Sequence, residues 1–182
     1  MPHESARRGR RLAPAIFLGL GWILGGCNAP AREPTPTLEP IQVLENLRRE
    51  LIPAEGSPTG YGPTFSNEGY ETLRQWNEII RPEPSWADDY ERLDISLTCC
   101  AADHPFEDES KNCGCGHHQA LYGLVKRLLQ TSTSVTAVQA EIYRWRAFMF
   151  PRETLAAEME RRAMDDPAIR QALDELRQQG IC

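Results

Sequence analysis

The stretch that decides the fold is residues 117–150, HHQALYGLVKRLLQTSTSVTAVQAEIYRWRAFMF. Its apolar residues recur every three or four positions, as Leu121, Leu124, Val125 and Leu128, and then as Val135, Val138, Ile142, Trp145 and Met149. This spacing is typical of helices that bury one face. Between the two series, Ser132 to Ser134 supply a turn and an N-cap. The stretch therefore predicts an antiparallel helical hairpin at the centre of the fold.

The same periodicity extends to both sides of this hairpin. It predicts helices over residues 41–52, 67–80 and 152–164, and a last helix from Asp166-Pro167 to Gly180. Ser85 with Asp88 resembles a capping box and predicts a short helix that runs through Tyr90 towards Leu97. Because alternating apolar patterns are almost absent, we expect an all-α fold, a small helical bundle. The aromatic residues of the hairpin are expected to fill its core; they are Tyr143, Trp145, Phe148 and Phe150.

The first residues of the chain predict export. Residues 1–11 hold four arginines against one acid, Glu4, and residues 12–24 (LAPAIFLGLGWIL) carry no charge. A transmembrane helix needs about 20 apolar residues, and this run has 13. A basic region followed by a short apolar one is typical of a signal peptide that is cleaved after export.

The apolar run ends in Leu24-Gly25-Gly26-Cys27, which resembles the lipobox of bacterial lipoproteins. The resemblance implies that a signal peptide of residues 1–26 is removed and that Cys27 carries lipid. The protein is then anchored to the membrane at its extracytoplasmic face, either at the cell membrane or at the outer membrane. The alternative is an ordinary secretory signal in which the cysteine has no role. We expect residues 27–40, rich in proline, to be a tether and residues 41–182 to be the helical domain.

The charge of the chain argues against nucleic acid as a partner. The full chain carries −6, and removal of the basic leader leaves about −9. After the leader, basic residues occur as short pairs such as Arg48-Arg49 and Arg161-Arg162, which are typical of solvated helix faces. A nucleic-acid interface needs a basic patch. A protein partner is not indicated by any motif.

The candidate site is a Cys/His-rich loop at residues 98–118, which precedes the central hairpin. It has no hydrophobic period, and its candidate ligands are Cys99, Cys100, Cys113, Cys115, His117 and His118, with His104 nearby. In an extended backbone, Cys113, Cys115 and His117 would point to one side, because side chains alternate. The histidines are expected where the loop enters the helix.

Three interpretations of the loop remain open. The thiolates and an imidazole are ligands that suit Cu(I) or zinc, which favours a soft-metal site. Alternatively, Cys99 and Cys100 pair with Cys113 and Cys115 in two structural disulfides, since thiols tend to be oxidised outside the cytoplasm. In the third interpretation the protein is a thiol-disulfide oxidoreductase, with a thiolate at the start of the helix stabilised by the helix dipole.

Residues 112–118 (NCGCGHH) resemble the bacterial lipoproteins named for a Pro-Cys-Tyr-Cys-Gly-Cys motif, and this implies an exported lipoprotein that binds metal. Residues 121–150, followed by Pro151, resemble the helical module of the thiol-reducing subunit of cytochrome c maturation. That module carries C-x-x-C before its first helix, where this chain has C-x-C. From residues and resemblances together we expect a membrane-anchored protein that carries or sequesters Cu(I) or zinc and is not an enzyme.

Overall fold

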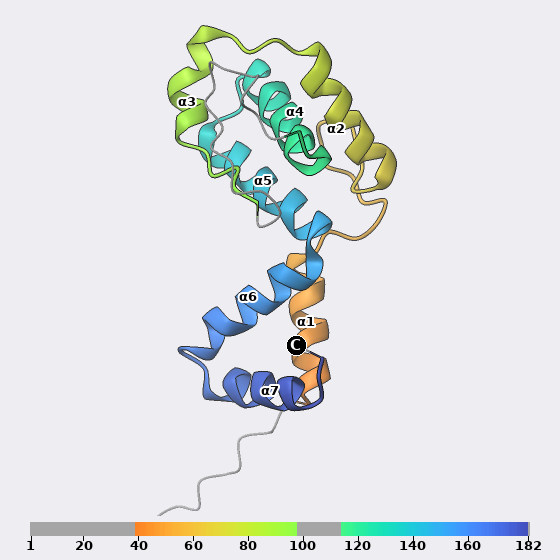
Figure 1. Cartoon of the computed structure of the whole chain (residues 1–182), viewed down its shortest axis with the longest axis vertical. Coiled ribbons are helices and arrows are strands. Elements are labelled where there is room, and N and C mark those ends of the chain that lie inside the picture. Colours follow the sequence, from red (N-terminus) through yellow and green to blue (C-terminus); the bar gives the residue numbers. More distant parts are fainter. Residues whose placement is uncertain (1–38, 98–113, 182) are drawn as a thin grey trace, which may run out of the picture. The chain divides into compact units, whose positions relative to one another are not determined.

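The all-α prediction is confirmed. The structure, a computed structural model, describes residues 39–97 and 114–181 (Figure 1). Within these ranges it contains seven α-helices, a short 3-10 helix and no strand. They are α1 (Pro40–Leu51), α2 (Asn67–Ile79), η1 (Pro84–Trp86), α3 (Ala87–Glu91), α4 (Gly116–Gln130), α5 (Val135–Met149), α6 (Pro151–Ala163) and α7 (Pro167–Gln178). The expected signal peptide, Cys27 and nearly all of the expected tether lie outside the described residues.

Within the described residues, the buried apolar side chains form two separate clusters. The larger one draws on α2 to α5 and includes Phe65, Leu73, Leu121, Ile142 and Trp145, each fully buried. The smaller one joins α1, α6 and α7 through Val43, Leu47, Met159, Ala163, Ala172, Leu173 and Leu176. In each cluster, the buried residues of a helix belong to the apolar stripe of that helix. Burial of apolar surface is the main source of stability. The helix α4, to which Cys115, His117 and His118 belong or are adjacent, contributes to the larger cluster.

The main partner of α4 is α2, whereas the sequence pattern predicted the α4–α5 hairpin as the centre of the core. The reason is Gly123, which lets the two backbones approach closely. A Cβ at this position would lie 1.8 Å from the carbonyl oxygen of Leu73 on α2. Lys126, one turn further on, is buried and donates a hydrogen bond to the carbonyl oxygen of Asn77 at 3.0 Å. Both contacts fix α4 against α2.

The predicted helix boundaries are mostly confirmed, and short polar side chains and prolines explain them. Ser66, Ser134 and Asp166 accept hydrogen bonds from the first free N–H groups of α2, α5 and α7. Proline occupies an early position of α1, α6 and α7, where its missing N–H costs nothing. Gly180 ends α7 with φ at +70°.

The prediction for residues 85–97 was wrong in two respects. Ser85 caps no helix: it lies inside the 3-10 helix η1, and α3 ends at Glu91. The chain departs from helical geometry after Glu91 because side chains of α5 bind Asp94. Gln139 accepts a hydrogen bond from the Asp94 N–H at 2.7 Å and donates one to its carbonyl oxygen at 3.2 Å, and Arg146 pairs with the Asp94 carboxylate at 3.0 Å.

The connection between α1 and α2 is irregular, and Tyr61 fixes it to α5. The Tyr61 hydroxyl accepts a hydrogen bond from Trp145 Nε1 at 2.8 Å and donates one to Glu141 at 2.9 Å. Burial raises the pKa of Tyr61 well above its ordinary value, so that it remains a donor. Of the aromatic residues predicted for the core, Trp145 is fully buried, and Phe148 and Phe150 are partly buried. Tyr143 is 52% exposed and does not belong to the core.

Candidate functional site

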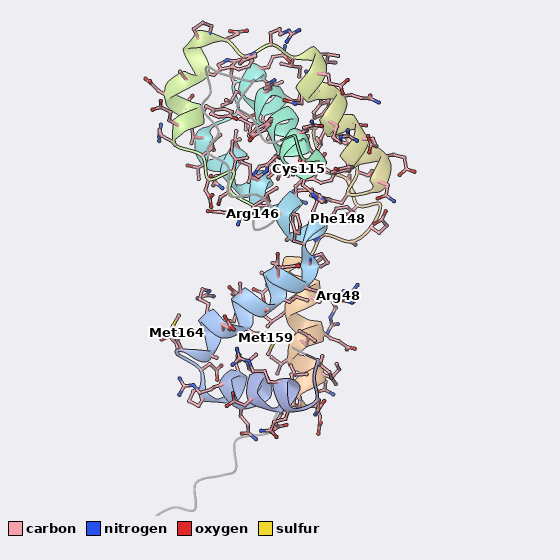
Figure 2. The ribbon with its side chains drawn as sticks, viewed as in Figure 1. Arg48, Cys115, Arg146, Phe148, Met159 and Met164 are labelled. Carbon is pink, nitrogen blue, oxygen red and sulfur yellow. The ribbon has the colours of Figure 1, made fainter. Side chains whose placement is uncertain are left out.

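Cys115 lies at the N-terminus of α4, where it is the N-cap residue (Figure 2). Its backbone is extended, with φ at −75° and ψ at 140°, and its sulfur accepts a hydrogen bond from the His118 N–H at 3.5 Å. The same sulfur lies 3.6 Å from Nδ1 of the His118 ring. Cys115 and His118 are thus a thiol and an imidazole in direct contact.

His118 is held in place from inside the larger core. Its side chain is fully buried, and its ring stacks on the ring of Tyr122 with centroids 5.8 Å apart and an interplanar angle of 17°. Burial raises the pKa of Tyr122 above its ordinary value, and the nearby Tyr90 and Cys115 add to the effect. Because packing fixes the imidazole, the Cys115–His118 separation is set by the fold and not by a flexible surface side chain.

The residue at which α4 begins determines which histidine contacts Cys115. The observed arrangement differs from the prediction, in which the backbone of residues 113–117 was extended. Since α4 begins at Gly116, the backbone is helical at His117 and His118. In a helix, the residue three positions on comes back to the same face, so His118 faces Cys115. His117 turns instead towards the rings of Tyr70 and Phe150, with centroids 5.8 Å and 4.8 Å away.

Residues from α2 hold the start of α4, and the sequence pattern did not reveal them. The fit at Gly116 is close, since a Cβ there would lie 2.3 Å from the Tyr70 hydroxyl. The Gln119 side chain donates a hydrogen bond to the Gly114 carbonyl oxygen at 3.3 Å and accepts one from Arg74 at 3.4 Å. The α2–α4 packing brings Tyr70 and Arg74 to the start of α4, so no local spacing could have identified these two residues.

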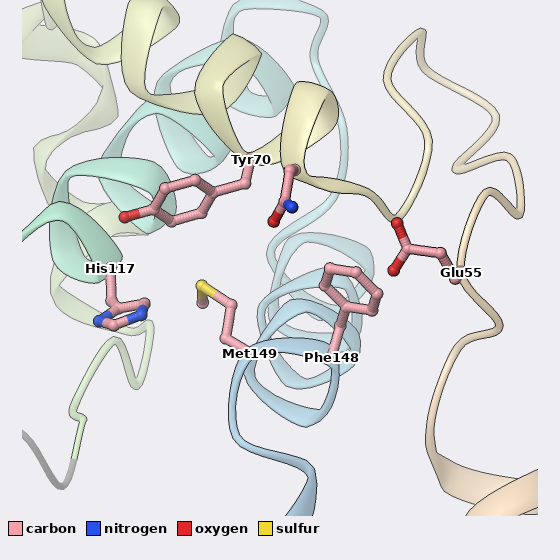
Figure 3. Close-up of a pocket in the computed structure, with 6 residues that line it drawn as sticks. Glu55, Tyr70, His117, Phe148 and Met149 are labelled. Carbon is pink, nitrogen blue, oxygen red and sulfur yellow. The ribbon is translucent and has the colours of Figure 1, made fainter.

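His117 lines a pocket of about 360 Å³ (Figure 3). The walls combine three aromatic rings, a thioether, an amide and a carboxylate, and the lining residues are Glu55, Asn67, Tyr70, His117, Phe148 and Met149. Figure 3 shows the sulfur end of Met149 and the ring of His117 projecting into this pocket. The pocket is therefore formed by the α1–α2 connection and by α2, α4 and α5.

The geometry of Cys115 and His118 fits two ligands of one metal ion. A tetrahedral site with a metal–sulfur bond of about 2.3 Å and a metal–nitrogen bond of about 2.05 Å places sulfur and nitrogen about 3.6 Å apart. The observed separation of Sγ and Nδ1 is 3.6 Å. Within residues 39–97 and 114–181, no three His, Cys, Asp or Glu side chains gather in a metal-binding group. Three of the predicted ligands, Cys99, Cys100 and Cys113, lie outside the described residues, as does His104.

Comparison with known proteins yields no relative: no protein-family model, curated protein or solved structure matches this chain. None of the helices in the described part of the chain has the length and apolar character needed to cross a membrane.

Proposed function

We propose that this protein is a bacterial lipoprotein, anchored through lipid on Cys27, that holds a soft metal ion at the N-terminus of α4. Cys115 and His118 are two of the ligands, and further thiolates come from Cys99, Cys100 and Cys113. The ion is Cu(I) or zinc, since both accept thiolate together with imidazole. With no reaction chemistry indicated, the role proposed is to carry or sequester the ion.

The observation that carries the proposal is the separation of 3.6 Å between Cys115 Sγ and His118 Nδ1. A metal bound by both atoms requires this separation. Two residues three positions apart at a helix start adopt it without strain, because Cys115 is still extended and His118 is one turn into the helix. The pair therefore has the spacing of two ligands of one ion.

The sulfur of Cys115 also has a backbone partner at the helix start. Cys115 is the N-cap residue of α4, and its sulfur accepts a hydrogen bond from the His118 N–H at 3.5 Å. The thiolate is the form of cysteine that binds metals, and it can keep this hydrogen bond while it binds an ion.

Metal content tests the proposal. The full chain is purified without oxygen in detergent, and copper, zinc and accessible thiols are counted. We expect at least one ion per chain, and we expect the metal content to fall by about one ion per chain in Cys115→Ser. The matched control is Cys182→Ser, which removes a thiol at the far end of the chain and should keep the ion. Absence of metal together with two disulfides among Cys99, Cys100, Cys113 and Cys115 would replace the metal site by a disulfide-stapled module.

The anchor is tested separately. Cells that express the chain are fed a labelled fatty acid, and we expect label on the wild-type protein and none on Cys27→Ser. Cys27→Ser should also retain residues 1–26, because lipobox cleavage follows lipid transfer. Export and cleavage of Cys27→Ser at the same position would instead show an ordinary secretory signal.

A further inference from the structure

The pocket beside the metal pair contains a second set of soft ligands that come from distant parts of the chain. His117 is the second residue of α4, and Met149 is the last residue of α5. Both line the same pocket of about 360 Å³. The ring of His117 packs 4.8 Å from the ring of Phe150, the residue that follows Met149, which fixes the histidine beside the end of α5.

We propose that His117 and Met149 form a second metal site, selective for Cu(I), on the pocket side of α4. Thioether sulfur is a soft ligand that suits Cu(I) and is foreign to zinc sites, whereas imidazole suits both. Cu(I) binds with two or three ligands, so a thioether and an imidazole are a sufficient protein contribution. The open volume of the pocket leaves room for a third ligand from the molecule that delivers the ion.

Both sites use residues at the N-terminus of α4, but their surroundings differ. His118 is fully buried and meets Cys115, whereas His117 is partly buried and meets the pocket. An ion at His117 and Met149 is thus open to exchange, and an ion at Cys115 and His118 is held more deeply. This inference rests on the proposed function for the choice of a soft metal, and it assigns Cu(I) to the second site.

Methionine methyl groups give a readout that is independent of the cysteines. The chain has four methionines, and Figure 2 labels two that serve as controls, Met159 on α6 and Met164 at its C-cap. Met164 is 69% exposed and reports on binding to any accessible thioether, whereas Met159 is fully buried in the smaller cluster and reports on the fold. Labelling the methionine methyl groups with ¹³C therefore separates specific binding, unspecific binding and unfolding in one spectrum.

The experiment adds Ag(I), a redox-inert substitute for Cu(I), to the full chain in detergent until the thiols are saturated and beyond. We expect the Met149 methyl resonance to shift at an Ag(I) concentration about tenfold lower than that needed for Met164, because the His117 imidazole is a second ligand held nearby. Met159 should not shift. An equal response of Met149 and Met164, or no response of Met149, would overturn the proposal.

Two variants and a second ion complete the test. His117→Phe keeps an aromatic ring between Tyr70 and Phe150 but removes the imidazole, and it should raise the Ag(I) requirement of Met149 to that of Met164. Zinc should leave the Met149 resonance unchanged, and a zinc-induced shift would contradict the Cu(I) selectivity. Loss of metal in Cys115→Ser reports on the first site only, so a failure of the proposed function and a failure of this inference are seen in different measurements.

Discussion

Gly123 of α4 lies against the backbone of Leu73 of α2, so closely that a Cβ at position 123 would be 1.8 Å from the Leu73 carbonyl oxygen. Gly123→Ala must therefore separate the two helices. We expect a loss of about 3 kcal/mol in the free energy of unfolding, at the upper end of overpacking costs. Urea denaturation followed by circular dichroism measures it.

Gly114→Ala is the matched control for this substitution. A Cβ at Gly114 would have no neighbour within 4 Å, so we expect a change of no more than about 0.5 kcal/mol. Equal stability of Gly123→Ala and Gly114→Ala would show that α2 and α4 are not packed as described.

Removal of the Tyr61 hydroxyl should destabilise the fold. Tyr61→Phe leaves the buried Nε1–H of Trp145 without its acceptor, and we expect a cost of about 2 kcal/mol. Tyr143→Phe is the control, because Tyr143 is 52% exposed and Phe keeps its aromatic contact with Arg146. The prediction fails if the two variants unfold at the same urea concentration.

The burial of Tyr122 should make the free energy of unfolding depend on pH at high pH. Its pKa is raised by burial, and the side chain is 1% exposed. A group whose pKa is higher in the folded state stabilises the fold below the unfolded pKa, about 10 for tyrosine, and this contribution is lost as pH rises above it. For Tyr122 the free energy of unfolding should fall by about 1.4 kcal/mol per pH unit. Tyr122→Phe should lack this part of the slope, and identical slopes above pH 10 would contradict the burial.

The ion pairs of Glu158 should make the free energy of unfolding depend on pH at low pH. Hydrogen bonds from Arg161 lower its pKa to about 2, against the opposing effect of burial, and a further bond from Arg162 adds to the lowering. A lowered pKa gives a contribution to stability that is present above the unfolded value near 4.5 and is lost as pH falls towards 2. NMR titration of the carboxyl carbon should place Glu158 near pH 2, and Arg161→Met should move it upward. An unchanged midpoint in that variant would refute the assignment.

Much of the helical fold could be predicted from the sequence because its signals are local. The stripe from Val135 to Met149, the cap at Ser134 and the prolines that start α6 and α7 each act within a few residues. The dominance of the α2–α4 contact could not be predicted, since a glycine within a helix does not indicate which helix packs against it. The end of α3 was missed for a similar reason: Gln139 and Arg146 hold Asp94 from 45 and 52 positions away.

The candidate site was predicted in part. The sequence identified Cys115, His117 and His118 as ligand candidates, and the structure brings Cys115 and His118 together. Which histidine faces the cysteine depends on the residue at which α4 begins, and a boundary of this kind is uncertain by one or two residues in any sequence argument. Met149 was predicted only as a core residue, because its position in a pocket with His117 depends on the packing of α5.

The most direct test of the central claim is the X-ray absorption spectrum of the full chain loaded with one equivalent of zinc. The account predicts sulfur at about 2.3 Å and imidazole nitrogen at about 2.0–2.1 Å in one coordination shell, with a smaller sulfur contribution in Cys115→Ser. A shell of oxygen and nitrogen alone, or a spectrum that Cys115→Ser leaves unchanged, would contradict it.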